Sequence, residues 1–198
     1  MTAKRLFDLS FSVVGLIPLL PVFIVIGGAV KLDSPGPVFF RQTRMGQFGR
    51  PFRIFKFRTM VTDAENGGAQ VSTVDDPRIT RVGRFLRKYK FDELPQLFNV
   101  AAGEMSLVGP RPEVPRYVEA YRKEYEAILA VKPGITDFAS LEYSDESDLL
   151  RTAENPEEKY LREILPAKME YYRKYIAEQS MATDIKLILK TVWKLVNT

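Results

Sequence analysis

Two adjacent carboxylates, Asp92 and Glu93, follow a segment whose charged side chains are all basic. Two unit charges about 6 Å apart repel each other by roughly 2–3 kcal/mol at an effective dielectric constant of about 20. Nearby cations reduce this cost, and they also attract a ligand more negative than the carboxylates themselves. The basic residues before the pair are Arg78, Arg81, Arg84, Arg87, Lys88 and Lys90. A carboxylate pair among cations is the arrangement expected for phosphate chemistry.

The composition narrows the chemistry that this chain can perform. It has 198 residues and contains neither cysteine nor histidine. Thiol nucleophiles, disulfides, Cys/His zinc sites and histidine acid–base catalysis are therefore excluded. The remaining groups are carboxylates, Lys, Arg, Tyr, hydroxyls and a bound hard cation, which gives Asp92 and Glu93 added weight.

The charge is unevenly distributed along the chain. The formal net charge is +4, but residues 36–90 hold twelve Lys and Arg against four Asp and Glu. Such an asymmetry favours a polyanionic ligand or an anionic membrane surface.

A second candidate phosphate ligand is Arg111, which lies between Pro110 and Pro112. Proline restricts the backbone on both sides, so the guanidinium can bind a phosphate bidentately at little entropic cost. The alternative is an ordinary surface arginine in a proline-bounded loop.

The elements that position these residues can be predicted in part. Residues 38–40 and 52–58 are typical of two short strands joined by a glycine-containing loop. Apolar and basic residues alternate in the second strand, so Arg53, Lys56 or Arg58 either faces phosphate or lies on a solvated face.

Helices are predicted at residues 77–90, 113–130 and 154–179, and another begins near Phe91. Asp92 suits the N-cap of that helix, since Pro95 is tolerated only in a first turn. Capping alone is thus an alternative role for Asp92, although it requires neither Glu93 nor the cations.

An apolar segment from Leu9 to Val30 has 22 residues and no charge. As a straight helix it would measure about 33 Å, enough to span a bilayer, and it is too long for a typical cleaved signal peptide. Pro18 and Pro21 predict a kink, and basic residues flank both ends. We expect a re-entrant helix that returns to the same membrane face, ahead of a spanning helix or a buried core helix.

The C-terminal segment, residues 184–197, is predicted to form an amphipathic helix with a ridge of Lys186, Lys190 and Lys194. It suits a lipid headgroup layer, but it can equally dock on the protein's own core. The expected division is a membrane-anchoring helix at 1–32, a catalytic domain at 33–182 and this helix at 183–198.

Several motifs, in order along the chain, resemble those of the bacterial sugar transferases, the small monotopic phosphoglycosyl transferases. They are Lys4-Arg5 with Asp8, the apolar segment with Pro21, Ser34-Pro35-Gly36-Pro37, Phe55-Lys56-Phe57-Arg58-Thr59-Met60, Asp92-Glu93-Leu94-Pro95-Gln96-Leu97-Phe98-Asn99 and Met105-Ser106-Leu107-Val108-Gly109-Pro110-Arg111-Pro112. The resemblance covers roughly residues 4–136, and the chain is similar to the minimal catalytic unit of the family.

The resemblance implies transfer of a phosphosugar from a UDP-sugar to undecaprenyl phosphate, with release of UMP and with Mg²⁺. It implies that Asp92 is the nucleophile, that Glu93 is a base or a metal partner, and that both contribute to the metal site. It implies that Pro21 breaks the re-entrant helix. Substrate-binding positions implied by the family are Lys56, Arg58, Arg87, Pro110, Arg111 and Pro112.

The resemblance also implies a fold and a location. The expected fold is α+β and mainly helical, with a short β-hairpin and amphipathic interfacial helices around the catalytic core. The expected location is the cytoplasmic face of the bacterial inner membrane, and a homodimer is left open. Many relatives continue after Gly-Ile-Thr with an arginine that this chain lacks, so the acidic loop 145–148 is a candidate for sugar contacts.

Two other functions are compatible with parts of the sequence. A non-enzymatic membrane adaptor would use the basic face to bind anionic lipid. A nucleic-acid binder would use the basic hairpin and its phenylalanines, but the apolar segment and the acidic C-terminal half argue against it.

Overall fold

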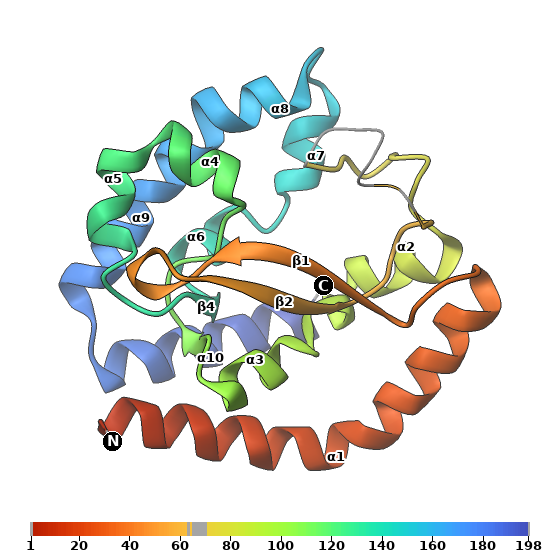
Figure 1. The fold of residues 1–198 in the computed structure, drawn as a ribbon, viewed down its shortest axis with the longest axis horizontal. Coiled ribbons are helices and arrows are strands. Elements are labelled where there is room, and N and C mark those ends of the chain that lie inside the picture. The colour runs from red at the N-terminus through yellow and green to blue at the C-terminus, as the bar shows by residue number, and fades with distance from the viewer. Residues whose placement is uncertain (1, 63, 65–70, 198) are drawn as a thin grey trace.

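The computed structural model describes residues 2–62, 64 and 71–197. The chain is mainly helical with two small sheets, which confirms the expected α+β class (Figure 1). The strands are β1 Phe39–Met45, β2 Pro51–Phe57, β3 Ser106–Val108 and β4 Gly134–Thr136. The α-helices are α1 Ala3–Asp33, α2 Arg81–Lys88, α3 Gln96–Ala102, α4 Pro115–Ala120, α5 Arg122–Ile128, α6 Phe138–Glu142, α7 Glu146–Arg151, α8 Pro156–Lys159, α9 Leu165–Glu178 and α10 Met181–Val196. The 3₁₀ turns η1 Gln47–Gly49 and η2 Phe91–Glu93 and the π-helical turn η3 Tyr160–Ile164 complete the elements.

The first helix, α1, contains the predicted apolar segment. It begins with Thr2 as N-cap, and it includes both Pro18 and Pro21. Figure 1 shows it running along one side of the molecule and then bending upward, as prolines inside a helix lead one to expect. It is long and apolar enough to cross a membrane. Much of its apolar surface is exposed, including Ile24 and Val25, so it is not the core helix of a soluble domain.

The two predicted strands form an antiparallel hairpin in the register Phe39↔Phe57 to Met45↔Pro51. The first strand is longer than the three residues predicted, because pairing with β2 continues as far as Met45. Phe52, Ile54 and Phe57 point into the protein and are buried.

The second sheet is a short parallel pair, Ser106↔Gly134 and Val108↔Thr136. The two backbones come very close just beyond it. A Cβ added to Gly109 would lie 2.4 Å from the carbonyl oxygen of Lys132, and one added to Gly134 would lie 2.0 Å from the amide nitrogen of Gly109. Only glycine fits at both positions, and this close approach fixes where the following Pro110–Pro112 segment starts.

The helix predicted at 77–90 is shorter than expected. It begins at Arg81, because Thr80 caps it by accepting a hydrogen bond from the Gly83 amide. The residue before the cap, Ile79, pairs instead with Met60 in an isolated β-bridge. The predicted helix at 113–130 is divided at Tyr121 into α4 and α5, and that at 154–179 comprises α8, η3 and α9.

Helices α4, α5 and α7 to α9 surround the largest hydrophobic core, with Tyr125, Leu165 and Tyr172 at its centre. A smaller core joins α1 to the hairpin and α2 through Phe23, Phe57 and Leu86.

The start of α1 is attached to the last helix. Lys4 forms an ion pair of 2.5 Å with Asp184 of α10, and the same carboxylate accepts a hydrogen bond from the hydroxyl of Tyr175 on α9. Asp184 is only 1% exposed. Asp8, also buried, accepts a hydrogen bond from the backbone amide of Leu107 in β3. These contacts place α1 against the segment that leads to Arg111.

Candidate active site

Asp92 lies in the 3₁₀ turn η2, between α2 and α3. Lys90, just before the turn, adopts a left-handed conformation with φ of 57°, which ends α2 and redirects the chain. The side chain of Asp92 is buried, with 7% exposure.

The expectation that Asp92 caps a helix is wrong. The N-cap position of α3 belongs to Pro95, and neither η2 nor α3 has a side-chain capping hydrogen bond. The 3₁₀ turn separates Asp92 from the helix start, so the carboxylate is not used to satisfy helix amides. It therefore stays available for chemistry at the cavity that it lines.

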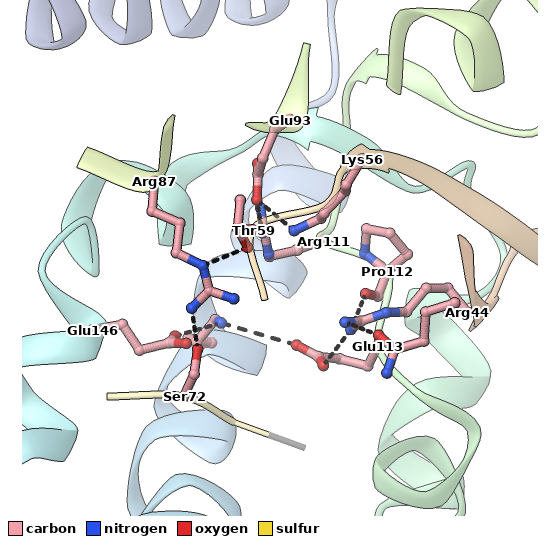
Figure 2. A network of polar contacts seen from close by, with 12 residues as sticks. Arg44, Lys56, Thr59, Ser72, Arg87, Glu93, Arg111, Pro112, Glu113 and Glu146 are labelled. Atoms are coloured by element: carbon pink, nitrogen blue, oxygen red, sulfur yellow. Dashed lines mark hydrogen bonds and ion pairs between the residues drawn. The ribbon is translucent and has the colours of Figure 1, made fainter. Parts of the chain in front are cut away.

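Glu93 is surrounded by cations. Its Oε1 accepts hydrogen bonds from Lys56 Nζ at 2.8 Å and from Arg111 Nη2, and its Oε2 accepts one from Arg111 Nη1 at 3.1 Å. Burial alone would raise the pKa of Glu93, but Arg111 and Lys56 hold this pKa well below its usual range. Glu93 thus holds both cations in place (Figure 2).

The electrostatic environment of Asp92 differs from that of its neighbour. Burial raises the pKa of Asp92, Lys56 opposes the increase, and the charge of Glu93 adds to it. Burial also lowers the pKa of Lys56 and of Arg87. These desolvated charges would each gain from a bound counter-charge, as expected of a site built for a phosphate and a cation.

Arg87 reaches the site from α2. Its Nε donates to Thr59 Oγ1 at 2.8 Å and its Nη1 to Ser72 Oγ at 2.6 Å. Helix α2 packs closely on the end of the hairpin, since a Cβ added to Gly83 would lie 2.1 Å from the carbonyl oxygen of Thr59. The close approach therefore sets where Arg87 projects.

The Pro110–Pro112 segment is held by hydrogen bonds as well as by its prolines. The carbonyl of Pro110 accepts from the Gly134 amide, and that of Pro112 accepts from Arg44 Nη1. The backbone amide of Arg111 donates to the buried carboxylate of Asp137. These hydrogen bonds support the predicted rigidity of Arg111, and its guanidinium contacts Glu93 of the Asp92–Glu93 pair, which we call the dyad.

Arg58 lies apart from this cluster. It is 5% exposed, and its guanidinium donates to the backbone carbonyls of Val30, Ser34 and Pro35 at the end of α1. The structure thus gives Arg58 the task of satisfying the last carbonyls of α1. Its predicted contact with substrate stays a prediction, as do those of Pro110 and Pro112.

A cavity of about 1060 Å³ opens at the dyad. Its charged wall includes Lys56, Arg87, Asp92, Glu93 and Arg111. Another part of the lining is apolar and comes from α1, α3 and α10, with Phe11, Leu97, Ile188, Val192 and Leu195. The cavity therefore joins a cationic pocket to elements with exposed apolar surfaces.

Sequence reasoning missed a second polar cluster in the cavity wall, which we call the Glu146–Lys168 cluster. It consists of Glu113, Glu146, Tyr160 and Lys168. Lys168 Nζ lies 2.8 Å from Glu146 Oε2 and 3.2 Å from the hydroxyl of Tyr160, which donates to Glu113 at 2.6 Å. These residues are far apart in sequence and share no motif. The only sequence signal was the acidic segment 145–148, which was predicted as a loop and instead forms the start of α7.

The carboxylates of this site can be compared with the ligands that Mg²⁺ commonly uses. Within residues 2–62, 64 and 71–197, no group of three or more carboxylates lies close enough to enclose a metal. Mg²⁺ is commonly bound through one or two carboxylates together with substrate phosphates. The carboxylate of Asp92 fits this mode, whereas both oxygens of Glu93 are already paired with cations.

Comparison with known proteins gives consistent matches over nearly the whole chain. The model of a family described as "Bacterial sugar transferase" matches residues 1–198. A protein of Escherichia coli (strain K12) named UDP-glucose:undecaprenyl-phosphate glucose-1-phosphate transferase is 40% identical over 195 residues, covering 96% of this chain and 39% of that protein.

Two further relatives differ in the sugar that they are named for. A Komagataeibacter xylinus protein named undecaprenyl-phosphate glucose phosphotransferase is 41% identical, covering 97% of this chain and 35% of its own length. An Aeromonas hydrophila protein named UDP-N-acetylgalactosamine-undecaprenyl-phosphate N-acetylgalactosaminephosphotransferase is 36% identical, covering 96% and 42%. The chain thus spans less than half the length of these three relatives.

Proposed function

The chain belongs to the bacterial sugar transferase family, and on this basis we propose that it transfers a sugar phosphate from a UDP-sugar to undecaprenyl phosphate and releases UMP. The observation that carries the proposal is the buried Asp92, which lacks a capping role, is acted on by the charges of Lys56 and Arg87, and lines the same cavity as Arg111. The names of the relatives support the same donor and acceptor classes.

The first half-reaction begins at Asp92. A carboxylate oxygen attacks the phosphorus that bears the sugar, the bond from this phosphorus to the UMP oxygen breaks, and UMP leaves with that oxygen. The product is a phosphosugar bound covalently to Asp92. Lys56, Arg87 and Arg111 stabilise the negative charge on the phosphoryl oxygens during the transfer.

In the second half-reaction an oxygen of undecaprenyl phosphate attacks the same phosphorus and the bond to Asp92 breaks. The lipid diphosphosugar forms and the carboxylate is restored. A shared covalent intermediate implies ping-pong kinetics. Glu93 keeps Lys56 and Arg111 in place through both steps, and its low pKa suits a fixed anion better than a base.

Magnesium is part of this proposal. Asp92, together with oxygens of the substrate diphosphate, would hold the ion. When bound, Mg²⁺ supplies positive charge to the diphosphate and so eases the approach of one anion to another.

The acceptor is expected to reach the site from a membrane. Helices α1 and α10 expose apolar side chains, among them Ile24, Leu189 and Trp193. The apolar lining of the cavity offers room for the lipid portion beside the charged wall. We propose that the protein lies on the cytoplasmic face of the bacterial inner membrane. In this proposal the bent helix α1 enters the membrane from that face and returns to it.

A covalent intermediate can be trapped to test the proposal. Protein incubated with a UDP-sugar and Mg²⁺, without lipid acceptor, should release UMP and gain the mass of one phosphosugar on the peptide that contains Asp92. The Asp92→Asn protein should show neither change. A non-enzymatic membrane adaptor would leave every UDP-sugar intact, and an adduct on a different residue would remove Asp92 from the nucleophile role.

A further inference from the structure

The Glu146–Lys168 cluster has features of a ligand-binding surface. Lys168 is 4% exposed and lies between Glu146 and Glu113, so its charge is compensated within the protein. Glu146 is more open, with 29% of its side chain exposed, and only its Oε2 is used by Lys168. A carboxylate held rigidly by one oxygen presents the other to the cavity as a hydrogen-bond acceptor.

A second observation at the same wall points to a missing partner. The hydroxyl of Ser140 is buried in the cavity lining and has no hydrogen-bond partner. Its backbone amide is fixed by Asp137 Oδ1, which makes the start of α6 rigid. A buried hydroxyl without a partner usually has a water molecule or a ligand to satisfy it.

The cluster lies close to the dyad. The charges of Glu146 and Glu113 both act on Arg111, which itself contacts Glu93. Figure 2 shows Glu93, Lys56 and Arg111 on one side of the site, with Glu146, Glu113 and Arg44 on the other. In a UDP-sugar the sugar is attached through one oxygen to the phosphorus that Asp92 would attack. The sugar must therefore lie next to the dyad during the reaction.

The charge of the cluster identifies the kind of group that it suits. With Arg44, which lies 3.5 Å from Glu113, the two carboxylates and two cations are balanced. A balanced, acceptor-rich wall does not suit another phosphate. It suits a neutral group that donates hydrogen bonds, and sugar hydroxyls are such donors.

We propose that Glu146, fixed by Lys168 and assisted by Ser140, is the sugar-specificity site of this chain and selects a neutral UDP-hexose with free ring hydroxyls. The inference rests on the proposed transfer reaction. The open oxygen of Glu146 accepts hydrogen bonds from the hydroxyls, whereas the carboxylate of a hexuronic acid would offer it only a second acceptor. An enzyme that hydrogen-bonds a substrate hydroxyl discriminates strongly against analogues that cannot pair with it.

The test compares sugars and variants by UMP release. UDP-glucose, UDP-galactose, UDP-N-acetylglucosamine and UDP-glucuronic acid are assayed with the full chain and with Glu146→Gln. We expect the wild type to prefer a neutral hexose over the uronic acid. Glu146→Gln should lower kcat/KM for the preferred hexose by about 10- to 100-fold, as expected for loss of a charged hydrogen bond, and should reduce discrimination against the uronic acid.

Inhibition by UDP shows whether Glu146 contacts the sugar or the nucleotide of the substrate. UDP lacks the sugar, so its inhibition constant should stay within about twofold of the wild-type value in Glu146→Gln. A parallel weakening of UDP inhibition would overturn the inference, because the cluster would then contact the nucleotide. Ser140→Ala, which removes an unsatisfied hydroxyl and should leave folding intact, should also lower kcat/KM for the hexose and not the affinity for UDP.

Asp148→Asn is the matched control, since Asp148 lies on the same helix, is exposed and does not line the cavity. It should behave as wild type. Unchanged sugar preference and kcat/KM in both Glu146→Gln and Ser140→Ala would overturn this inference alone. Absence of UMP release from every UDP-sugar by the wild type would instead overturn the transfer reaction and this inference with it.

Discussion

At the scale of single residues, Asp92 and Glu93 are neighbours in the chain but differ in their surroundings. Burial raises the pKa of Asp92, whereas Arg111 and Lys56 hold that of Glu93 well below its usual range. Environments that separate the pKa values of two carboxylates also separate their roles. Asp92 lines the cavity, whereas the carboxylate of Glu93 is paired with two cations.

Asp92→Asn should abolish activity while stabilising the fold. A raised folded-state pKa means that stability is greatest below the unfolded pKa of about 3.9 and declines as pH rises through the folded value. At neutral pH the buried, ionised Asp92 is therefore destabilising, and a neutral amide removes that cost. We expect UMP release to fall by about 10³-fold or more and the melting temperature at pH 7 to rise. A lower melting temperature would contradict this account of Asp92.

Glu93→Gln should have the opposite effect on stability. It leaves Lys56 and Arg111 without their anion, and removal of one partner from a buried ion pair costs about 3–5 kcal/mol. Because the folded-state pKa of Glu93 is depressed, its contribution is present above about pH 4.3 and is lost as pH falls through the folded value. The difference in unfolding free energy between wild type and variant, measured from pH 7 to pH 3, should shrink at the acid end. A difference independent of pH would refute the ion-pair explanation.

At the scale of elements, sequence patterns predicted what depends on local periodicity. A long apolar segment predicted α1, and apolar residues interspersed with basic ones predicted the hairpin strand that carries Lys56. The N-cap role considered for Asp92 is not observed, because Lys90 adopts a left-handed conformation and a 3₁₀ turn precedes α3. No residue pattern in the sequence predicts either of these two features. The Glu146–Lys168 cluster was missed because its members come from separate parts of the chain and meet only through side-chain contacts in the folded protein.

A substitution at Gly83 tests whether α2 must pack closely against Thr59. Alanine normally stabilises a helix relative to glycine by about 1 kcal/mol. At Gly83, however, the added Cβ would lie 2.1 Å from the Thr59 carbonyl, so α2 must shift and carry Arg87 with it. Gly83→Ala should lower both the melting temperature and the rate of UMP release. Gly28→Ala in α1, where nothing lies within 4 Å of the added Cβ, is the control: it should keep the rate of UMP release, and its melting temperature should stay the same or rise.

At the scale of the whole molecule, exposed apolar side chains are concentrated on α1 and α10. The lysines of α10 divide between two roles. Lys194 donates to the carbonyl of Leu141, whereas Lys186 and Lys190 are exposed. The sequence left membrane contact and docking on the core as alternatives for this helix. The structure shows docking, since Leu187 is buried, and it leaves Trp193 72% exposed, so membrane contact through the exposed face stays a prediction.

Trp193 is the only tryptophan in the chain, so its fluorescence reports on α10 alone. We expect a blue shift of its emission when vesicles containing anionic lipid are added to the detergent-free protein. Lys186→Gln with Lys190→Gln should weaken vesicle binding, since each lysine near an anionic surface contributes about 1 kcal/mol. Unshifted emission at saturating vesicle concentration would show that Trp193 stays in water.

The ion pair between Lys4 and Asp184 has a consequence for the order in which the protein is built. The two residues are 180 positions apart. At translation rates of 5–20 residues per second, about 10–35 s separate their synthesis. For most of that interval all residues of α1 have been synthesised, while the carboxylate that pairs with its first turn does not yet exist. We therefore expect the proposed membrane insertion of α1 to precede formation of this ion pair, and a chain that ends before Asp184 would lack the contact that joins α1 to α10.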